Sequence, residues 1–136
     1  MSARTFMAIV AVFIAWSVIG FLVHGILLQD AYVASSELWR PIGEMKMQLM
    51  YSVTLAASIC FVLVYSCLVS RKSLDAGIKL GLLLGLASGI SMGFGSYSYM
   101  PISMTMAQAW FAAALVEGLL AGILVGSIIV PQDEVA

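Results

Sequence analysis

Residues 104–130 read MTMAQAWFAAALVEGLLAGILVGSIIV and contain a single charged residue, Glu117. A helix needs about 20 predominantly apolar residues to cross the hydrocarbon core of a bilayer. The apolar residues of this stretch are continuous rather than alternating, which is typical of a membrane helix and not of a barrel strand. The stretch therefore predicts a transmembrane helix near 104–130. Pro131 ends it, because proline has no backbone N–H to donate.

The rest of the chain contains further stretches of the same character. No Asp, Glu, Lys or Arg lies between Arg4 and Asp30, or between Lys46 and Arg71. The turn signal SYSYMP at 96–101 divides the long apolar region after Lys79. We therefore expect four spans, near 5–28, 46–70, 77–97 and 104–130. The first span is too long for a signal peptide and no small-x-small cleavage site follows it closely, so we expect it to be retained.

Composition supports the membrane interpretation. Of the 136 residues, 62% are hydrophobic and only 10% are charged, against about 25% in typical soluble domains. The net charge is -1 and there are two cysteines, which excludes a disordered chain, a nucleic-acid binder and a disulfide scaffold. We interpret residues 1–136 as a single transmembrane domain of the all-α class.

The basic residues predict how the domain is oriented in the membrane. One side collects four of them, whereas the other side has two that are offset by three acidic residues. The four are Arg4, Arg71, Lys72 and Lys79, and the two are Arg40 and Lys46. This bias predicts that both termini lie in the cytoplasm and that the loop 29–45 is on the outer side. Since the other loops are short, we expect an up-down-up-down antiparallel four-helix bundle.

Aromatic side chains mark the expected outer boundary of the membrane, where amphipathic rings prefer to lie. They are Tyr32, Trp39, Tyr97, Tyr99 and Trp110. The same level contains the only histidine, His24, and most of the nine methionines. Soft thioethers with an imidazole suit Cu(I), so a weak metal site is one interpretation. Its candidates are His24, Met45, Met47, Met104 and Met106. The alternative is that His24 is an interfacial imidazole and that the methionines fill apolar gaps.

Small residues recur every four positions in the last two spans. Two faces follow from this spacing. They consist of Gly77, Gly81, Gly85, Gly89 and Gly93 in the third span, and of Ala114, Gly118, Gly122 and Gly126 in the fourth. Helices in a bilayer associate by close backbone contact, so each series forms a groove for another helix, as in a glycine zipper. The two spans either pack on each other or offer one groove to another subunit.

Glu117 is the most informative single residue. A charge near the middle of a span costs several kcal/mol, so we expect this side chain to face the bundle interior and to be neutral at pH 7. At similar depth lie Ser17, Ser58 and Ser88, whose hydroxyls could bond the carboxyl. Two interpretations stay open. Glu117 is either a protonated interhelical clamp, or a group that relays protons or binds a cation.

The chain contains none of the common catalytic motifs. There is no P-loop, HExxH, CxxC or nucleophile elbow, and no cofactor is indicated. We therefore expect a non-enzymatic membrane protein that has a structural or accessory role, or that self-associates through its glycine faces. Such a protein is a homo-oligomer or a subunit of a larger complex. The alternatives are a small proton- or cation-coupled transporter or channel that uses Glu117, and the outward-facing copper site.

Three segments resemble a known group of proteins. They are LWRP at 38–41, EMKM at 44–47, and SMGFG at 91–95 after the glycine-rich span. Together they look like short four-span bacterial membrane proteins of the domain-of-unknown-function type, over nearly the whole chain. The resemblance implies a bacterial cytoplasmic (inner) membrane protein. It implies no activity and no catalytic residues.

Overall fold

The computed structural model describes residues 2–130, which form helices and short connections without any strand. Four helical segments are long and apolar enough to cross a membrane. They are Ala3–Leu27, Met47–Leu68, Leu74–Tyr99 and Met104–Ile128. The prediction of an all-α protein with four candidate membrane spans is confirmed, and a multi-pass membrane protein follows from it. Pro131 and the end of the chain lie outside the described residues.

Most spans combine an α-helix with a wider π-helical turn. The α-helices are α1 (Ala3–Gly20), α2 (Gln29–Ala34), α3 (Met47–Leu63), α4 (Leu74–Gly89), α5 (Ser96–Tyr99) and α6 (Met104–Ile128). The π-helical turns extend α1 over Phe21–Leu27, extend α3 over Val64–Leu68, and join α4 to α5 over Ile90–Gly95. In the first of them the Leu28 N–H donates to the Val23 carbonyl at 2.9 Å, five residues back.

The limits of the spans differ from the expected ones for local reasons. Serine side chains accept a backbone N–H at the start of α1, α4 and α6, and so satisfy donors that a helix end leaves free. These caps are Ser2, Ser73 and Ser103. The third span therefore begins at Leu74, directly after its cap. It also continues to Tyr99, so the turn expected from residue 96 is confined to 100–103.

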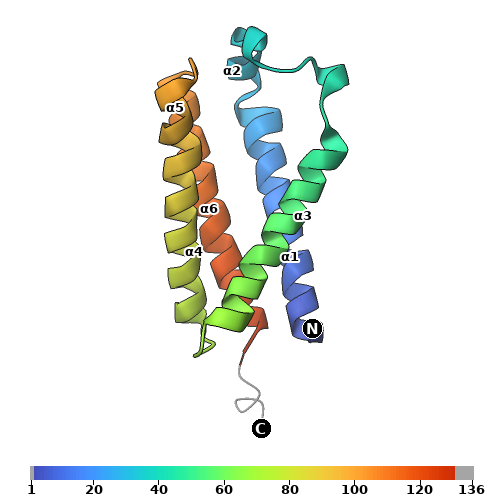
Figure 1. Ribbon diagram of the computed structural model, residues 1–136, viewed down its shortest axis with the longest axis vertical. Helices are drawn as coiled ribbons and strands as arrows, with labels where there is room; N and C mark the ends of the chain where they lie inside the picture. Colours follow the sequence, from blue (N-terminus) through green and yellow to red (C-terminus); the bar gives the residue numbers. More distant parts are fainter. Residues whose placement is uncertain (1, 131–136) are drawn as a thin grey trace.

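The two ends of the molecule are distinct in Figure 1. At the lower end lie the start of α1, the connection 69–73 and the end of α6, and Arg4 Nη1 donates to the Val130 carbonyl there at 3.2 Å. We call this the Tyr65 end. At the upper end lie α2 and the connection 100–103, and we call this the Tyr32 end.

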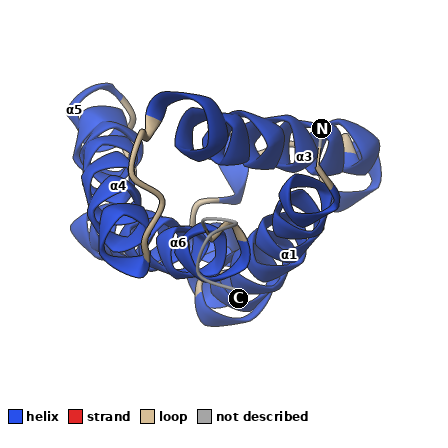
Figure 2. Ribbon diagram, turned by 90° about the horizontal axis from the view of Figure 1, so that it is seen from below, coloured by secondary structure: helices blue, strands red, loops and turns tan. Residues whose placement is uncertain are grey.

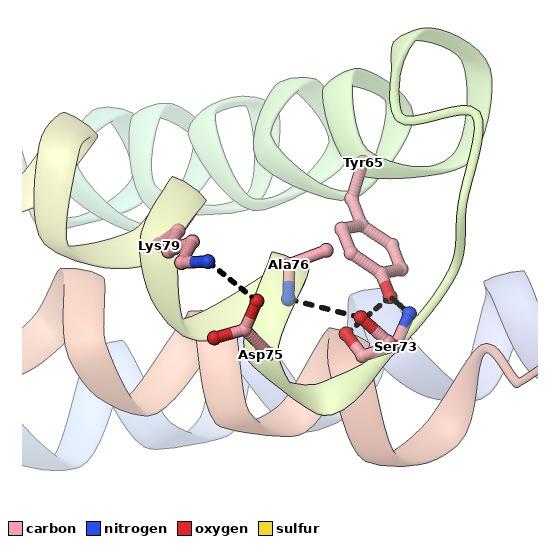
Figure 3. Close-up of polar contacts among 5 residues, drawn as sticks. All are labelled: Tyr65, Ser73, Asp75, Ala76 and Lys79. Carbon is pink, nitrogen blue, oxygen red and sulfur yellow. Dashed lines mark hydrogen bonds and ion pairs between the residues drawn. The ribbon is translucent and has the colours of Figure 1, made fainter.

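The connection between α3 and α4 is held by one buried side chain. The Tyr65 hydroxyl accepts a hydrogen bond from the Ser73 N–H and donates one to the Ser73 carbonyl, both at 2.9 Å (Figure 3). Tyr65 is fully buried, and Lys72 Nζ lies 5.8 Å from its ring centroid. The exposed pair Asp75–Lys79 follows in the first turns of α4 (Figure 3). Tyr65 thus ties the π-helical turn that extends α3 to Ser73, the N-cap residue of α4.

The helices α4 and α6 make the most extensive contact of any two helices in the described chain. A Cβ added to any glycine of the two series would come closer than 3.0 Å to the backbone of the other segment. For example, a Cβ at Gly85 would lie 2.9 Å from the Ala114 carbonyl oxygen, and one at Gly89 would lie 2.9 Å from that of Phe111. The two series face each other within one chain, so neither is free to bind another subunit.

The other large contact joins α1, α3 and α6 around a buried cluster near the Tyr65 end. Figure 2, seen from that end, shows these helices and α4 around a common centre. The cluster is filled by side chains rather than by backbone. Its buried members are Ala8, Ile9, Val12, Phe61, Val62, Tyr65, Ala121, Val125 and Ile129. A second, smaller cluster of buried residues lies at the Tyr32 end, and it consists of Leu28, Ile102, Met106 and Ala107.

Candidate functional site

The side chains on one face of α3 are exposed in the first half of the helix and buried in the second half. The spacing of four and three residues places a row of six side chains on this face. The row is Met47, Tyr51, Thr54, Ser58, Val62 and Tyr65. The last three are fully buried, whereas Met47 and Tyr51 are 48% and 51% exposed. The face that packs on α1 and α6 at the Tyr65 end is therefore uncovered toward the Tyr32 end, where α3 leans away from α4 and α6 (Figure 1).

The facing rows of α6 and α1 change at the same level. On α6, Ala121 is fully buried and Glu117, one turn closer to the Tyr32 end, is half-buried. On α1, Val12 is fully buried and Trp16 is half-buried, and a Cβ added to Gly20 would meet nothing within 4 Å. The packing of three helices thus ends at one level, with Glu117 at its edge. Beyond this level the facing surfaces of the three helices are uncovered. We call this surface the open half, and it includes Met47, Tyr51 and Thr54 of α3, Glu117 of α6 and Gly20 of α1.

Trp16 marks the level at which the packing ends. Its indole N–H donates to the Glu117 backbone carbonyl at 2.8 Å, and its ring meets Phe61 edge-on with 5.7 Å between centroids. One side chain of α1 therefore touches both α6 and α3. Buried tryptophans usually find a partner for the indole N–H. That requirement is the one signal in the sequence that could have singled out Trp16, which was not among the predicted site residues.

The carboxyl group of Glu117 has no hydrogen-bond partner among residues 2–130. The three serines at similar depth direct their hydroxyls elsewhere. Ser58 donates to the Thr54 carbonyl and Ser88 to the Leu84 carbonyl, each within its own helix, and Ser17 Oγ is buried without a partner. The hydrogen bonds that the clamp interpretation would make between Glu117 and these serines are thus not formed in the described chain. Helix backbones satisfy serine hydroxyls locally, which sequence depth alone does not reveal.

A polar aromatic cluster lies at the Tyr32 end of the molecule. The Trp110 indole N–H donates to the Tyr32 hydroxyl at 2.9 Å, and the same hydroxyl lies 2.6 Å from His24 Nδ1. The Tyr32 hydroxyl thus contacts both the Trp110 indole and the His24 imidazole. Trp39 packs edge-on against Tyr32 at 5.2 Å between ring centroids. The cluster therefore joins α1, α2 and α6.

Burial raises the pKa of the Tyr32 phenol above its ordinary value of 10, and the hydrogen bond from Trp110 offsets part of that change. The phenol is therefore neutral over the physiological range.

The four methionines of the predicted copper site do not share one environment. Met106 is buried against Leu28 and Ile102, whereas Met45, Met47 and Met104 are exposed. His24 Nδ1 is already bonded to Tyr32. Within the described residues, no group of three or more His, Cys, Asp or Glu side chains is placed to hold a metal ion. No observation in the structure therefore favours the copper site over gap filling by methionine.

Comparison of the chain with protein-family models, with curated proteins and with solved structures finds no match to any of them.

Proposed function

We propose that this chain is a non-enzymatic accessory subunit of a larger membrane complex in the bacterial cytoplasmic membrane. The observation that carries the proposal is the half-buried Glu117 carboxyl, which lies inside a membrane span without a partner in the described chain. Ionisable groups at this depth are costly and are found paired or facing a cavity. A neighbouring protein that supplies the missing partner resolves this cost. The two glycine series are buried against each other, so a neighbouring protein would have to bind a different surface of this chain.

The proposal includes an orientation, with both termini in the cytoplasm and an up-down-up-down order of the four spans. The Tyr65 end carries Arg4, Arg71, Lys72 and Lys79, and cytoplasmic loops are enriched in such residues. Reporter fusions after Ser73 and at the C-terminus should be active on the cytoplasmic side, and a fusion within 30–40 on the opposite side. A C-terminal fusion that is active outside would refute this orientation.

Association is tested on the full chain in its native membrane. A photo-crosslinking amino acid is placed at one exposed position of each long helix and at Tyr51. The other positions are Val10, Val53, Leu83 and Leu120. We expect an adduct of one defined mass above the 14.5 kDa chain, formed from some of these positions and not from others. A chain that stays monomeric in mild detergent and forms no adduct from any position would refute the accessory role.

A proton- or cation-coupled transporter is the second candidate, because Glu117 is half-buried rather than sealed. A group that cycles its charge must be reachable from water. Full-length protein in liposomes that enclose a pH-sensitive dye gives the test. Proton flux that is present in the wild type and absent in Glu117→Gln would favour transport, and equal leakage in both would favour the accessory role.

A further inference from the structure

The geometry points to the open half as the binding surface for a transmembrane helix from a different protein. That helix presents a basic side chain to Glu117. This inference rests on the accessory role proposed above and deepens it. It names the surface that binds and the chemistry of the partner.

The surface is defined by one set of rows that passes from buried to uncovered. Met47, Tyr51 and Thr54 continue the α3 row that is fully buried at Ser58, and Glu117 continues the α6 row that is fully buried at Ala121. A helix seated in the open half would extend the existing packing of α1, α3 and α6 along the same faces. Methionine suits such a surface, because its flexible thioether adapts to the shape of a partner.

Close approach is possible on the α1 side of the open half. Glycine lets another backbone come near, and nothing in the chain uses that freedom at Gly20, where an added Cβ meets no atom within 4 Å. Gly20 lies one turn beyond Trp16, where the packing of α1, α3 and α6 ends.

The charges of this chain select the partner. Besides His24, whose Nδ1 is bonded to Tyr32, its candidate spans contain two basic residues, Arg4 and Lys79. Arg4 bonds the Val130 carbonyl and Lys79 pairs with Asp75, so both are engaged at the Tyr65 end. A second copy of this chain therefore has no free cation at the depth of Glu117. A different protein with a Lys or Arg in the middle of a membrane helix supplies the complementary charge.

The test uses a synthetic apolar helix of about 20 Leu and Ala residues as the probe, with one central Lys. A matched peptide carries Leu at that position. Both are mixed with the full-length chain in phosphatidylcholine liposomes, and the chain carries the photo-crosslinking residue at Tyr51 or, as the control on the opposite face of α3, at Val53. We expect the Lys peptide to be captured from position 51 about tenfold more than the Leu peptide, and position 53 to show no such preference.

Glu117→Gln keeps the size of the side chain and removes the carboxyl group that a neighbouring Lys would ionise and pair with. The preference for the Lys peptide should then fall to within about twofold of the Leu peptide, while the melting temperature of the protein stays unchanged. Equal capture of the two peptides by the wild type would overturn the inference. So would a preference that survives in Glu117→Gln, or adducts at position 51 that join two copies of this chain.

Failure of this inference and failure of the accessory role give different results. If the native-membrane adducts arise from Val10, Val53, Leu83 or Leu120 and not from Tyr51, the accessory role stands and the open half is not the binding surface. If no position gives an adduct, the accessory role itself fails.

Discussion

The two large helix contacts of this molecule use opposite kinds of surface. In the α4–α6 contact, a glycine of the third span lies at every turn directly against the backbone of α6, and Gly118, Gly122 and Gly126 of α6 lie in the same way against α4. In the contact of α1, α3 and α6, large side chains such as Phe61, Val62 and Tyr65 fill the space at one end only. The backbone contact therefore continues along α4 and α6, whereas the side-chain contact of α1, α3 and α6 is confined to the Tyr65 end.

The difference has a physical origin in the bilayer. Lipid chains are as apolar as leucine, so burial from water does not draw two apolar helices together, and close van der Waals contact must do so. The glycine faces provide that contact at every turn. The α3 face provides it at Ser58, Val62 and Tyr65, whereas Met47 and Tyr51 on the same face are about half exposed.

The largest expected effect separates the two contacts directly. Gly81→Ala puts a Cβ closer than 3.0 Å to the α6 backbone, which cannot yield without separating the helices. We expect a loss of about 3 kcal/mol in the free energy of unfolding, measured by titration with a denaturing detergent. The matched variant Gly20→Ala adds the same methyl where nothing lies within 4 Å, and it should be neutral or slightly stabilising. Equal losses in the two variants would remove the distinction between the contacts.

The next effect compares the two halves of the α3 row. Tyr65→Ala removes a fully buried ring and both hydrogen bonds to Ser73, so we expect a loss of about 3 kcal/mol in the free energy of unfolding. Tyr51→Ala removes the same side chain from a position that is 51% exposed, and the change should be within about 0.5 kcal/mol. A large loss for Tyr51→Ala in the isolated protein would show that the open half is closed in solution.

An intermediate effect is expected at the aromatic cluster, which joins α1 to α6 beyond the open half. Tyr32→Phe leaves the Trp110 N–H and His24 without their shared partner, at a cost of about 1–2 kcal/mol in the free energy of unfolding. The raised pKa of Tyr32 fixes the sign of the pH dependence. The contribution of Tyr32 is fully present below pH 10, and it is lost as pH rises through the pKa of the folded state. The control is Tyr97→Phe, which removes a hydroxyl from an exposed tyrosine at the same end of the molecule. It should melt like the wild type.

The smallest effect is expected at Glu117. Because its carboxyl bonds no group in the described chain, Glu117→Gln and Glu117→Ala should both lie within about 0.5 kcal/mol of the wild type in isolated protein. Thermal melting in detergent measures this. A loss of 1 kcal/mol or more that occurs in Glu117→Ala and not in Glu117→Gln would reveal an interhelical bond, as the clamp interpretation expects.

The number of spans and the faces of α4 and α6 could be read from the sequence. Charge-free stretches longer than a bilayer is thick leave helices as the only spanning structure, and this follows from hydrogen bonding alone. Glycine every four residues lies on one face by the geometry of the helix. Both inferences use local properties of the chain, so they need no knowledge of its neighbours.

The tertiary structure alone decided which surfaces meet and where they stop meeting. The sequence placed Glu117, Ser58 and Ser88 at one depth, but each serine bonds its own helix and the carboxyl bonds neither. It gave no sign that Tyr65 would be buried and Tyr51 exposed on one face of one helix. That outcome depends on the inclination of α3, which is set by contacts between residues far apart in the chain. Such contacts leave no periodic signal in the sequence.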